Sequence, residues 1–556
     1  MINTSTQGMN DQKYIHRPLL DARSIRVLAL EPAHSLADPL HCRLDDVSLD
    51  DASKSPYNAL SYVWGARTGD RAIQCEGRIM LVTESCELAL RYLRHESATR
   101  TLWVDAICIN QQSVAELDQQ VPLMADIYRL AEKVTIWLGV GSPECFETVR
   151  KAKLLYATRH VLGGRTIDLA AKWYAWGNRA QSHSDTFPSL CEHSWFKRIW
   201  TLQEFIFAQS PVVMVGKHTC TADALEAYFR WRWPRFLEAD RHRGAYFASR
   251  SLVKQLFALK RSSTFAHAWI VIKLLQYASP NEATEPADKI YGLISLLRHQ
   301  GTEGDLQLPV IDYSRPVQDV YEDLSRQLIR FSRVLWTLQF VGLESRVSGL
   351  PSWVADWNLR FLGGSVKMDL DLYTTTRKSE IDMDLFEASL KHHLALKGQL
   401  FSTVSHVSQR VPAVRNYDNS VESVTAIAAH IPMLLEFAAE ANRRHGKAAG
   451  SYEGCLATLT YNARGGPMVT DIIAFTTESG HLSVTMAAVQ VGDVVVLFAG
   501  AEVPFILRRK DRGGNEESAI QNTYVFVGPA IVHRIMDGEA WPEETVVKDL
   551  ETFILE

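Results

Sequence analysis

The sequence lacks the features that mark membrane proteins, secreted proteins and strongly basic nucleic-acid-binding proteins. Its longest apolar stretch, HAWIVIKLLQYA at 267–278, is interrupted by Lys273 and is well short of the roughly 20 residues that span a bilayer. The N-terminus, MINTSTQGMNDQKYIHR, is polar and has no apolar signal core. A net charge of −5 disfavours a general nucleic-acid-binding surface. We therefore expect no membrane span, no nucleic-acid partner and a cytoplasmic protein, although the sequence does not separate cytosol from nucleus.

The sequence also lacks the short motifs of several enzyme classes. No two of its eight cysteines form a C-x-x-C pair, and no Cys/His cluster has zinc-ligand spacing, so we expect free, mostly buried thiols and no metal site. The patterns G-x-x-x-x-G-K-[ST], G-x-S-x-G and H-E-x-x-H are absent. These absences argue against a P-loop nucleotidase, a nucleophile-elbow hydrolase and a zinc peptidase.

What is present is a composition typical of globular proteins, with 46% hydrophobic and 22% charged residues over 556 positions. That length allows roughly two to four domains. Changes in sequence pattern predict four parts: a flexible arm at 1–20, an α/β domain at 21–220, a mainly helical region at 221–385 and a β-rich module at 386–556.

Strand and helix patterns alternate in the second of these parts. Strand-like runs begin near residue 23 and recur at Ala59–Trp64, Leu102–Val104, Val134–Leu138 and Val212–Val215. Helical periodicity follows at Thr83–Arg94 and Leu123–Lys133. The alternation predicts an α/β fold with a mostly parallel sheet flanked by helices. Ser113 and Glu116 have capping-box spacing, and Pro122 is expected to break the helix that follows them.

The last two parts differ in their periodicity. Val320, Leu324 and Leu328 form one row of an amphipathic helix. From about residue 390, short β-branched runs are separated by Gly, Asp and Asn, which is typical of strands and turns. A helical insertion is expected at roughly 420–445, and a mobile hairpin loop is expected at 511–522.

Four motifs in the α/β part carry the clearest functional signal. They are YNALSYVWG from residue 57, WVDAICINQQ from 103, VPLMADIYRLAEKVTIWLG from 121 and WFKRIWTLQEFIFA from 195. Together they resemble the signature of the fungal heterokaryon-incompatibility (HET) domain, and DKIYGL, LPSWVADW and IMDGEAW extend the resemblance along the chain. The resemblance implies a TIR/flavodoxin-like sheet and a role in programmed cell death after non-self recognition. The chain departs from the family at Arg534, where many members have glycine.

The resemblance also directs attention to one glutamate. Some TIR domains hydrolyse NAD+ with a glutamate in a helix that begins Trp-Cys-x-x-Glu, and Trp200 and Glu204 have similar spacing. This implies Glu204 as the catalytic carboxylate, NAD+ as a substrate and no bound cofactor. Such a carboxylate can stabilise an oxocarbenium-like centre, and the Trp200 indole can stack on a base. The alternative is that Lys197, Thr201 and Glu204 form a solvated helix face of little energetic weight.

Polar residues at the predicted strand ends are the other site candidates. Asp105 follows a strand, where ligands bind in open α/β sheets, and it is the second catalytic candidate; its alternative role is to cap the next turn. Asn110 could bind a ligand amide or shape a turn. Both readings stay open.

The first and last motifs supply the remaining candidates for substrate binding. Ser61 could bond a ribose, Trp64 could contact a base, and Gly65 would let a ligand approach the backbone. Arg198 could pair with Asp105 or with a phosphate. The alternatives are that Trp64 is a packing anchor and that Arg198 is an ordinary surface arginine.

Three functions are compatible with these patterns. The first is a HET protein that acts in non-self recognition, with or without NAD+ hydrolysis. The second is a non-catalytic signalling module that self-associates or binds another incompatibility protein. The third is a biosynthetic enzyme that acts on a small-molecule ligand. A pocket containing Glu204, Asp105 and Trp64 would favour an enzyme; burial or internal pairing of these side chains would favour the signalling module.

Overall fold

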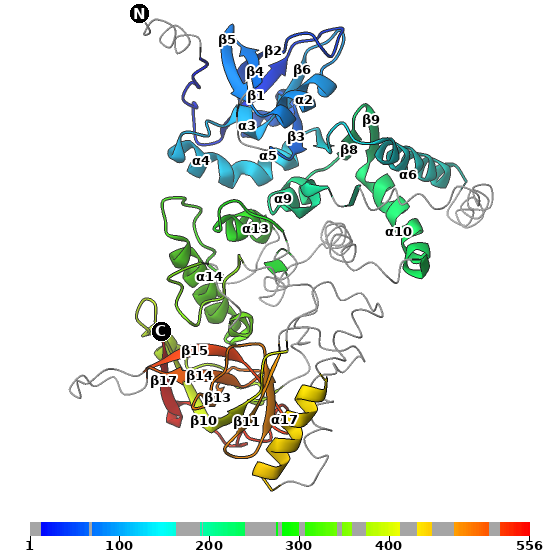
Figure 1. Cartoon of the computed structure of the whole chain (residues 1–556). Helices are drawn as coiled ribbons and strands as arrows, with labels where there is room; N and C mark the ends of the chain where they lie inside the picture. The colour runs from blue at the N-terminus through cyan, green and yellow to red at the C-terminus, as the bar shows by residue number, and fades with distance from the viewer. Residues whose placement is uncertain are drawn as a thin grey trace, which may run out of the picture.

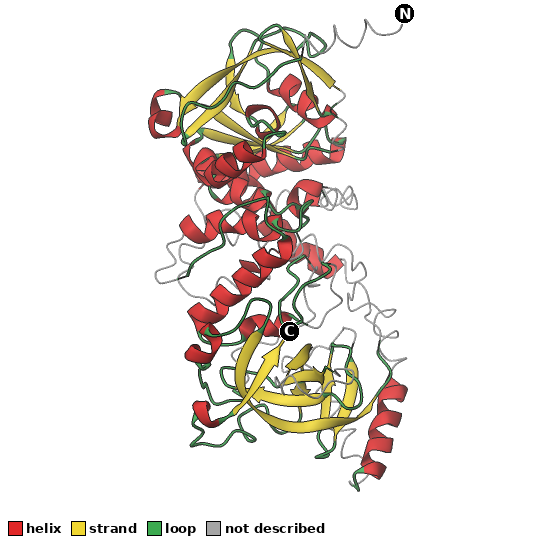
Figure 2. Cartoon of the chain, turned by 90° about the vertical axis from the view of Figure 1, so that its left-hand side faces the viewer, coloured by secondary structure: helices red, strands yellow, loops and turns green. Residues whose placement is uncertain are grey.

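Within the residues that it describes, the computed structural model places a nine-stranded sheet and an eight-stranded sheet at opposite ends of the molecule, with helices between them (Figures 1 and 2). The described residues are 13–65, 69, 71–162, 190–191, 193–239, 274–275, 278, 281–299, 306–341, 347–358, 374–411, 431–446, 472–510 and 523–556. The candidate site residues named above all lie within these ranges, whereas the predicted loop at 511–522 lies outside them.

The first sheet contains the predicted strands, and its order is β5-β4-β2-β1-β6-β3-β7-β8-β9 in the described part of the chain. The strands are β1 (Ser24–Leu30), β2 (His41–Ser48), β3 (Asn58–Tyr62), β4 (Arg71–Cys75), β5 (Arg78–Val82), β6 (Arg100–Trp103), β7 (Lys133–Trp137), β8 (Pro211–Val215) and β9 (His218–Thr221). Strands β6, β3, β7 and β8 are mutually parallel neighbours. Numbered among themselves along the chain, these four have the order 2-1-3-4.

The prediction of a mostly parallel sheet is only partly right, because the sheet is mixed. The pairs β1–β2, β1–β6, β4–β5 and β8–β9 are antiparallel. The β4–β5 hairpin turns at Glu76 and Gly77, which both have positive φ, 51° and 73°. Positive φ at both central residues is the backbone of a tight hairpin turn. These outer strands are short, and half of their residues face solvent, so their patterns did not stand out in the sequence.

Helices connect and cover the strands of this sheet. They are η1 (Leu49–Lys54), α2 (Glu84–Leu93), α3 (Asp105–Cys108), α4 (Val114–Gln120), η2 (Val121–Leu123), α5 (Met124–Leu130), α6 (Pro143–Leu162), η3 (Ser194–Lys197), α9 (Thr201–Ile206) and α10 (Ala222–Ala239). Thr83 caps α2 by accepting a hydrogen bond from Cys86 N. The predicted break is confirmed, since Pro122 lies in a 3-10 turn between α4 and α5.

A buried arginine organises one edge of this domain. Arg26 is 1% exposed and makes a two-pronged ion pair with Glu116, with N–O distances of 2.6 and 3.1 Å. Ser113 caps α4 as expected, but Glu116 therefore turns to Arg26 instead of closing a capping box. Tyr14 is buried, and its N–H bonds to Ile79 O at 2.8 Å. The described end of the predicted arm thus packs against the domain.

The middle region contains α13 (Asp288–His299), α14 (Val317–Ser332), η4 (Trp336–Phe340) and α15 (Met383–Glu387). The amphipathic row of α14 is confirmed, because Val320, Leu324 and Leu328 are all buried. The helical expectation for residues 240–273 lies outside the described part of the chain. Among the described residues, no helix has the length and apolar character needed to cross a membrane.

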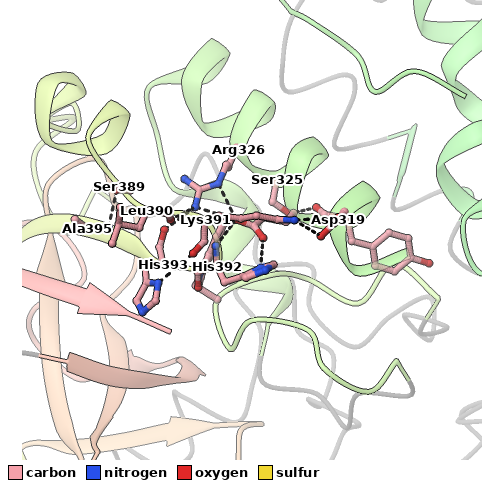
Figure 3. A network of polar contacts seen from close by, with 12 residues as sticks. Asp319, Ser325, Arg326, Ser389, Leu390, Lys391, His392, His393 and Ala395 are labelled. Carbon is pink, nitrogen blue, oxygen red and sulfur yellow. Dashed lines mark hydrogen bonds and ion pairs between the residues drawn. The ribbon is translucent and has the colours of Figure 1, made fainter. Parts of the chain in front are cut away.

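An ion-pair network joins α14 to the segment that leads into the second sheet (Figure 3). Glu322, which is 2% exposed, accepts from Arg326 at 2.9 Å and lies 2.7 Å from the His392 ring nitrogen. Lys391 pairs with Asp319 at 3.0 Å. The buried carboxylate is therefore matched by cationic and hydrogen-bonding partners on both sides.

The β-rich prediction for the C-terminal part is confirmed. The described strands are β10 (Leu394–Val407), β11 (Ile473–Thr477), β12 (Leu482–Thr485), β13 (Val494–Phe498), β14 (Phe505–Arg509), β15 (Thr523–Pro529), β16 (Ile531–Val532) and β17 (Glu551–Leu555). Their order is β13-β14-β15-β17-β10-β11-β12-β16, and β13 also pairs with β10, so five strands close into a ring. The predicted helical insertion is described in part as α17 (Ile431–Arg444).

Asp493 and Arg534 are two residues of this module with unusual local environments. Asp493, 2% exposed, pairs with Arg508 through two bonds of 2.8 and 2.9 Å. Arg534 has φ 68°, a left-handed conformation that favours glycine. Arg534 therefore has a backbone conformation that suits the glycine found at this position in many family members.

Candidate functional site

The candidate residues converge where β3 and β6 end beside α9. Ser61 lies in β3, Asp105 begins the turn after β6, and Glu204 lies in the last of the four motifs on α9. Because β3 and β6 are parallel neighbours, their carboxyl ends meet at one edge of the sheet. Ligands bind at this edge in open α/β sheets. The fold thus brings three separate motifs to a single place.

The deepest part of the site is a hydrogen-bonded chain of three buried side chains. Trp195 Nε1 donates to Ser61 Oγ at 2.7 Å, and Ser61 Oγ donates to Glu204 Oε2. The exposed fractions are 1% for Trp195, 0% for Ser61 and 2% for Glu204. We refer to these three residues as the buried triad.

Burial changes the acidity of the Glu204 carboxyl. It raises the pKa of Glu204 from 4.5 to about 7, because the charged form loses its hydration. Arg198 lowers this pKa and Asp105 raises it through their charges, and the Ser61 hydrogen bond lowers it. The carboxyl therefore takes up and releases a proton near neutral pH.

The predicted alternative of a solvated face for α9 is wrong. Thr201 is 1% exposed and donates to two backbone carbonyls, Trp195 O at 3.0 Å and Arg198 O at 2.8 Å. Glu204, on the same row, is buried. This row of the short helix faces protein and fixes the loop that precedes it.

Asp105 and Trp64 form the outer part of the site. Trp64 Nε1 donates to Asp105 Oδ2 at 2.8 Å, and Asp105 Oδ1 accepts from Ala106 N at 2.7 Å. Both side chains are half-buried. Asp105 therefore stabilises its own turn and also aligns the indole at the sheet edge.

Arg198 lies between the two parts. Its Nη1 donates to Tyr62 O, at the end of β3, with a distance of 2.5 Å. Its charge acts on Glu204, where it lowers the pKa. The half-buried guanidinium is thus not an isolated surface group. Among the described residues, its interaction with Glu204 is through charge and not through a hydrogen bond.

The other three candidates lie further from the triad's chemistry. Trp200 Nε1 donates to Asp288 on α13 at 3.1 Å, so the indole is directed to the middle region. Asn110 Oδ1 accepts from Gln112 N at 3.2 Å, which supports the turn-forming reading. Gly65 has φ 72°, a backbone conformation that favours glycine, although there is open space where a side chain would lie.

Sequence reasoning missed the polar role of Trp195. Its position in the row with Ile199 and Leu202 indicated a core residue, and it is indeed 1% exposed. The indole N–H nevertheless supplies the donor that fixes Ser61. No pattern in a single sequence distinguishes such an indole from an ordinary core tryptophan.

A charged groove lies elsewhere in the molecule. It has a volume of about 220 Å³ and is lined by Arg315, Asp319, Glu322, Asp323, Arg326, Arg330, Phe386, Glu387, Ser389 and Lys391. Its cations are paired with its carboxylates, as in Arg330 with Glu387 at 2.5 Å. None of the residues of the buried triad lines this groove.

Two family models match separate parts of the chain. The model of the family "Heterokaryon incompatibility protein (HET)" matches residues 57–204, and that of the "Het-6 beta-barrel domain" matches 438–549. The chain is 24% identical to "Heterokaryon incompatibility protein 6, OR allele" of Neurospora crassa, over 93% of this chain and 94% of that protein. No solved structure matches. The HET match contains every candidate site residue.

Proposed function

The chain belongs to the heterokaryon-incompatibility (HET) protein family, and from this premise we propose that it triggers programmed cell death in fungal non-self recognition by hydrolysing NAD+ at Glu204. The proposal has two parts. The biological part comes from the family and from the relative in Neurospora crassa. The chemical part depends on the site.

The strand order supports a TIR/flavodoxin-like assignment for the HET domain. The four parallel strands have the order 2-1-3-4, which is the beginning of the flavodoxin-like order 2-1-3-4-5. In that fold the ligand lies at the carboxyl edge, beside the point where the strand order reverses. Ser61 and Tyr62 end the first of these strands, so the candidate residues lie where the fold would bind its ligand.

The observation that carries the chemical proposal is the burial of Glu204 with no cation at contact distance among the described residues. Burial of a carboxyl that is 2% exposed and bonded to a serine hydroxyl destabilises the charged form, because that form loses its solvation. A carboxyl with a pKa of about 7 at the ligand edge of a sheet is a common property of functional sites.

The proposed reaction consumes water and needs no bound cofactor. The bond between the nicotinamide nitrogen and the ribose C1′ breaks, and its electron pair leaves with nicotinamide. The ionised Glu204 stabilises the oxocarbenium-like ribose, as in glycoside hydrolysis. Water adds at C1′ and loses a proton, giving ADP-ribose, nicotinamide and H+. Ser61 holds the carboxylate in place, and Arg198 favours its charged form.

Substrate access sets a condition on this mechanism. Trp195 and Glu204 are almost fully buried, so NAD+ reaches the carboxyl only after a local movement. We assign this movement to the Trp195–Trp200 segment, because Trp195 bonds Ser61 beside Glu204. The nearby half-buried Trp64 and Asp105 would then lie at the entrance.

The second candidate function is a non-catalytic signalling module. It is favoured by one observation: Glu204 and Asp105 both have their hydrogen-bond partners inside the protein, Ser61 and Trp64. In this reading the buried triad stabilises the HET domain, which acts by self-association or by binding another incompatibility protein.

Release of nicotinamide from NAD+ by the purified full-length protein separates these functions. We expect Glu204→Gln, which preserves shape and hydrogen bonding, to reduce release at least about 100-fold. Glu322→Gln is the matched control, because Glu322 is also 2% exposed but lies on α14. Background release from wild type and Glu204→Gln alike would reject NAD+ hydrolysis. Equal growth arrest by both proteins in a fungal host would then favour signalling.

A further inference from the structure

The segment that carries Arg198 and leads into α9 is held by residues outside the HET match. Ile199 N donates to Glu282 O at 3.0 Å, and Glu282 N donates to Lys197 O. Residues 198 and 282 therefore form a parallel β-bridge. Two stretches that are far apart in the sequence are thus joined through their backbones.

Two buried side chains reinforce this bridge. Asn281 is 1% exposed, and its Nδ2 donates to Arg198 O at 3.0 Å. Lys289 is 4% exposed, and its Nζ donates to Asn281 O. The carbonyl of Arg198 therefore accepts from the side chain of Asn281, and the backbone carbonyl of Asn281 is held by the Lys289 ammonium group.

Asp288 makes the third connection. Its two carboxylate oxygens accept from Trp200 Nε1 at 3.1 Å and from Tyr313 OH at 2.9 Å. Asp288 is 7% exposed and is the first residue of α13, where the helix dipole favours a negative charge. Hydrogen bonds to a charged acceptor are among the stronger ones in proteins.

Close packing completes the connection. A Cβ on Gly292 would lie 2.9 Å from Ile199 Cγ1, so only glycine lets α13 approach this closely. Figure 1 shows α13 beside α9 and below the HET sheet, and the two helices are in contact. We refer to residues 281–292 as the clamp.

The clamp and the sheet hold the same segment through separate contacts. Arg198 holds Tyr62 O, and Trp195 holds Ser61, while the clamp holds the backbone of residues 197–199 and the indole of Trp200. Because the clamp holds this segment by its backbone and by the Trp200 indole, displacement of the segment relative to α13 breaks contacts with the clamp.

We infer that the clamp is an intramolecular restraint that keeps the Trp195–Trp200 segment closed over Glu204, with Asp288 as the positioning residue that sets its strength. The HET unit thus extends functionally into the middle region. Tyr321 on α14 donates to Pro286 O at 2.7 Å, so the helix that contacts the C-terminal module also touches the clamp. The inferred effect on catalysis rests on the proposed NAD+ hydrolysis, whereas the restraint itself does not.

Hydrogen–deuterium exchange of the full-length protein tests the restraint. Asp288→Ala and Trp200→Phe remove the same hydrogen bond from its two sides. Each is expected to speed amide exchange in residues 199–207 about tenfold to a hundredfold, with exchange in β13 and β14 unchanged. Asp493→Ala, the matched loss of a 2% exposed carboxylate in the C-terminal module, should leave residues 199–207 unchanged.

Two outcomes would overturn the inference. One is unchanged exchange in residues 199–207 of Trp200→Phe. This variant keeps an aromatic ring and hence the packing, so it serves as the test even if Asp288→Ala fails to fold. The other is an equal increase in Asp493→Ala, which would mean general loosening.

Kinetics provide the readout that a merely structural role would not give. If the clamp limits opening, Asp288→Ala should lower the apparent KM for NAD+ by the factor by which exchange rises, because the competent fraction increases. A fall in kcat at constant KM would mean that Asp288 only supports the fold, and would contradict its positioning role. Local exchange that rises while no variant releases nicotinamide would leave the restraint intact and reject the proposed function.

Discussion

Two carboxylates that are buried to the same extent have opposite surroundings in the two sheet-containing regions. Asp493 in the C-terminal module and Glu204 in the HET domain are both 2% exposed. Asp493 is neutralised by a two-pronged bond with Arg508, whereas Glu204 is held by the hydroxyl of Ser61. The first arrangement stabilises the charged form, and the second leaves the charged form poorly solvated. Asp493 therefore stabilises the C-terminal module through an ion pair, whereas Glu204 has no such pair among the described residues.

Removing the structural carboxylate should have the largest effect on stability. Asp493→Ala loses both Arg508 bonds and the acceptor of Gln490 N. We expect the C-terminal module to lose about 3 to 4 kcal/mol of unfolding free energy, at the low end for a broken buried pair because Arg508 is 35% exposed and can be rehydrated. Denaturant unfolding measures this loss. A loss below about 1 kcal/mol would show that the two carboxylates do not differ as described.

Replacing Glu204 should instead change how stability depends on pH. Its folded pKa, about 7, lies above the ordinary value of 4.5, so the fold favours the protonated carboxyl. This contribution, which is at most roughly 3 kcal/mol, is complete below pH 4.5 and is lost as pH rises through about 7.

Unfolding free energies of wild type and Glu204→Gln between pH 4.5 and 8 test this prediction. We expect the difference between them to shift in favour of the glutamine variant as pH rises, and then to level off above about pH 7. A pH-independent difference would place the carboxyl in a hydrated environment and remove the contrast with Asp493.

The strain at Arg534 offers a smaller effect in the C-terminal module. Arg534→Gly relieves a left-handed backbone, φ 68°, at some cost in chain entropy. We expect a net gain of about 0.5 to 1 kcal/mol in denaturant unfolding and no change in nicotinamide release. A loss of stability would mean that contacts of the arginine side chain outweigh the backbone strain.

Neighbouring charges should shift the Glu204 titration in opposite directions, with the smallest effects. Asp105→Asn keeps an acceptor for Trp64 and should lower the pKa of Glu204, whereas Arg198→Gln should raise it. Infrared difference spectra of the carboxyl band, with Glu204→Gln as the blank, measure both shifts. Shifts of the same sign would contradict the described electrostatics.

The local structure could largely be predicted from the sequence. The periodicity of Thr83–Arg94 predicted α2, Pro122 predicted the break before α5, and Val320, Leu324 and Leu328 predicted the buried face of α14. These predictions succeed because helix periodicity and helix breaking act over a few residues. The short outer strands could not be predicted, since half-exposed hairpin strands have weak patterns. For this reason the sequence predicted a mostly parallel sheet, whereas the observed sheet is mixed.

The candidate site was only partly predictable for a related reason. The motifs marked Ser61 and Glu204 separately, but they are 143 positions apart, and their contact depends on how α9 packs against β3. The same packing turns Trp200 towards Asp288 and recruits Trp195 as a donor. Such contacts depend on tertiary geometry, which residue type and spacing do not determine.

The pH profile of nicotinamide release tests the central claim most directly. If the ionised Glu204 stabilises the transition state, kcat/KM for NAD+ should rise with pH through an apparent pKa near 7 and then level off. Glu204→Gln should show only background release at every pH. Release that is equal in the two proteins, or absent from both across this range, would contradict the claim that Glu204 is the catalytic carboxyl of this HET protein.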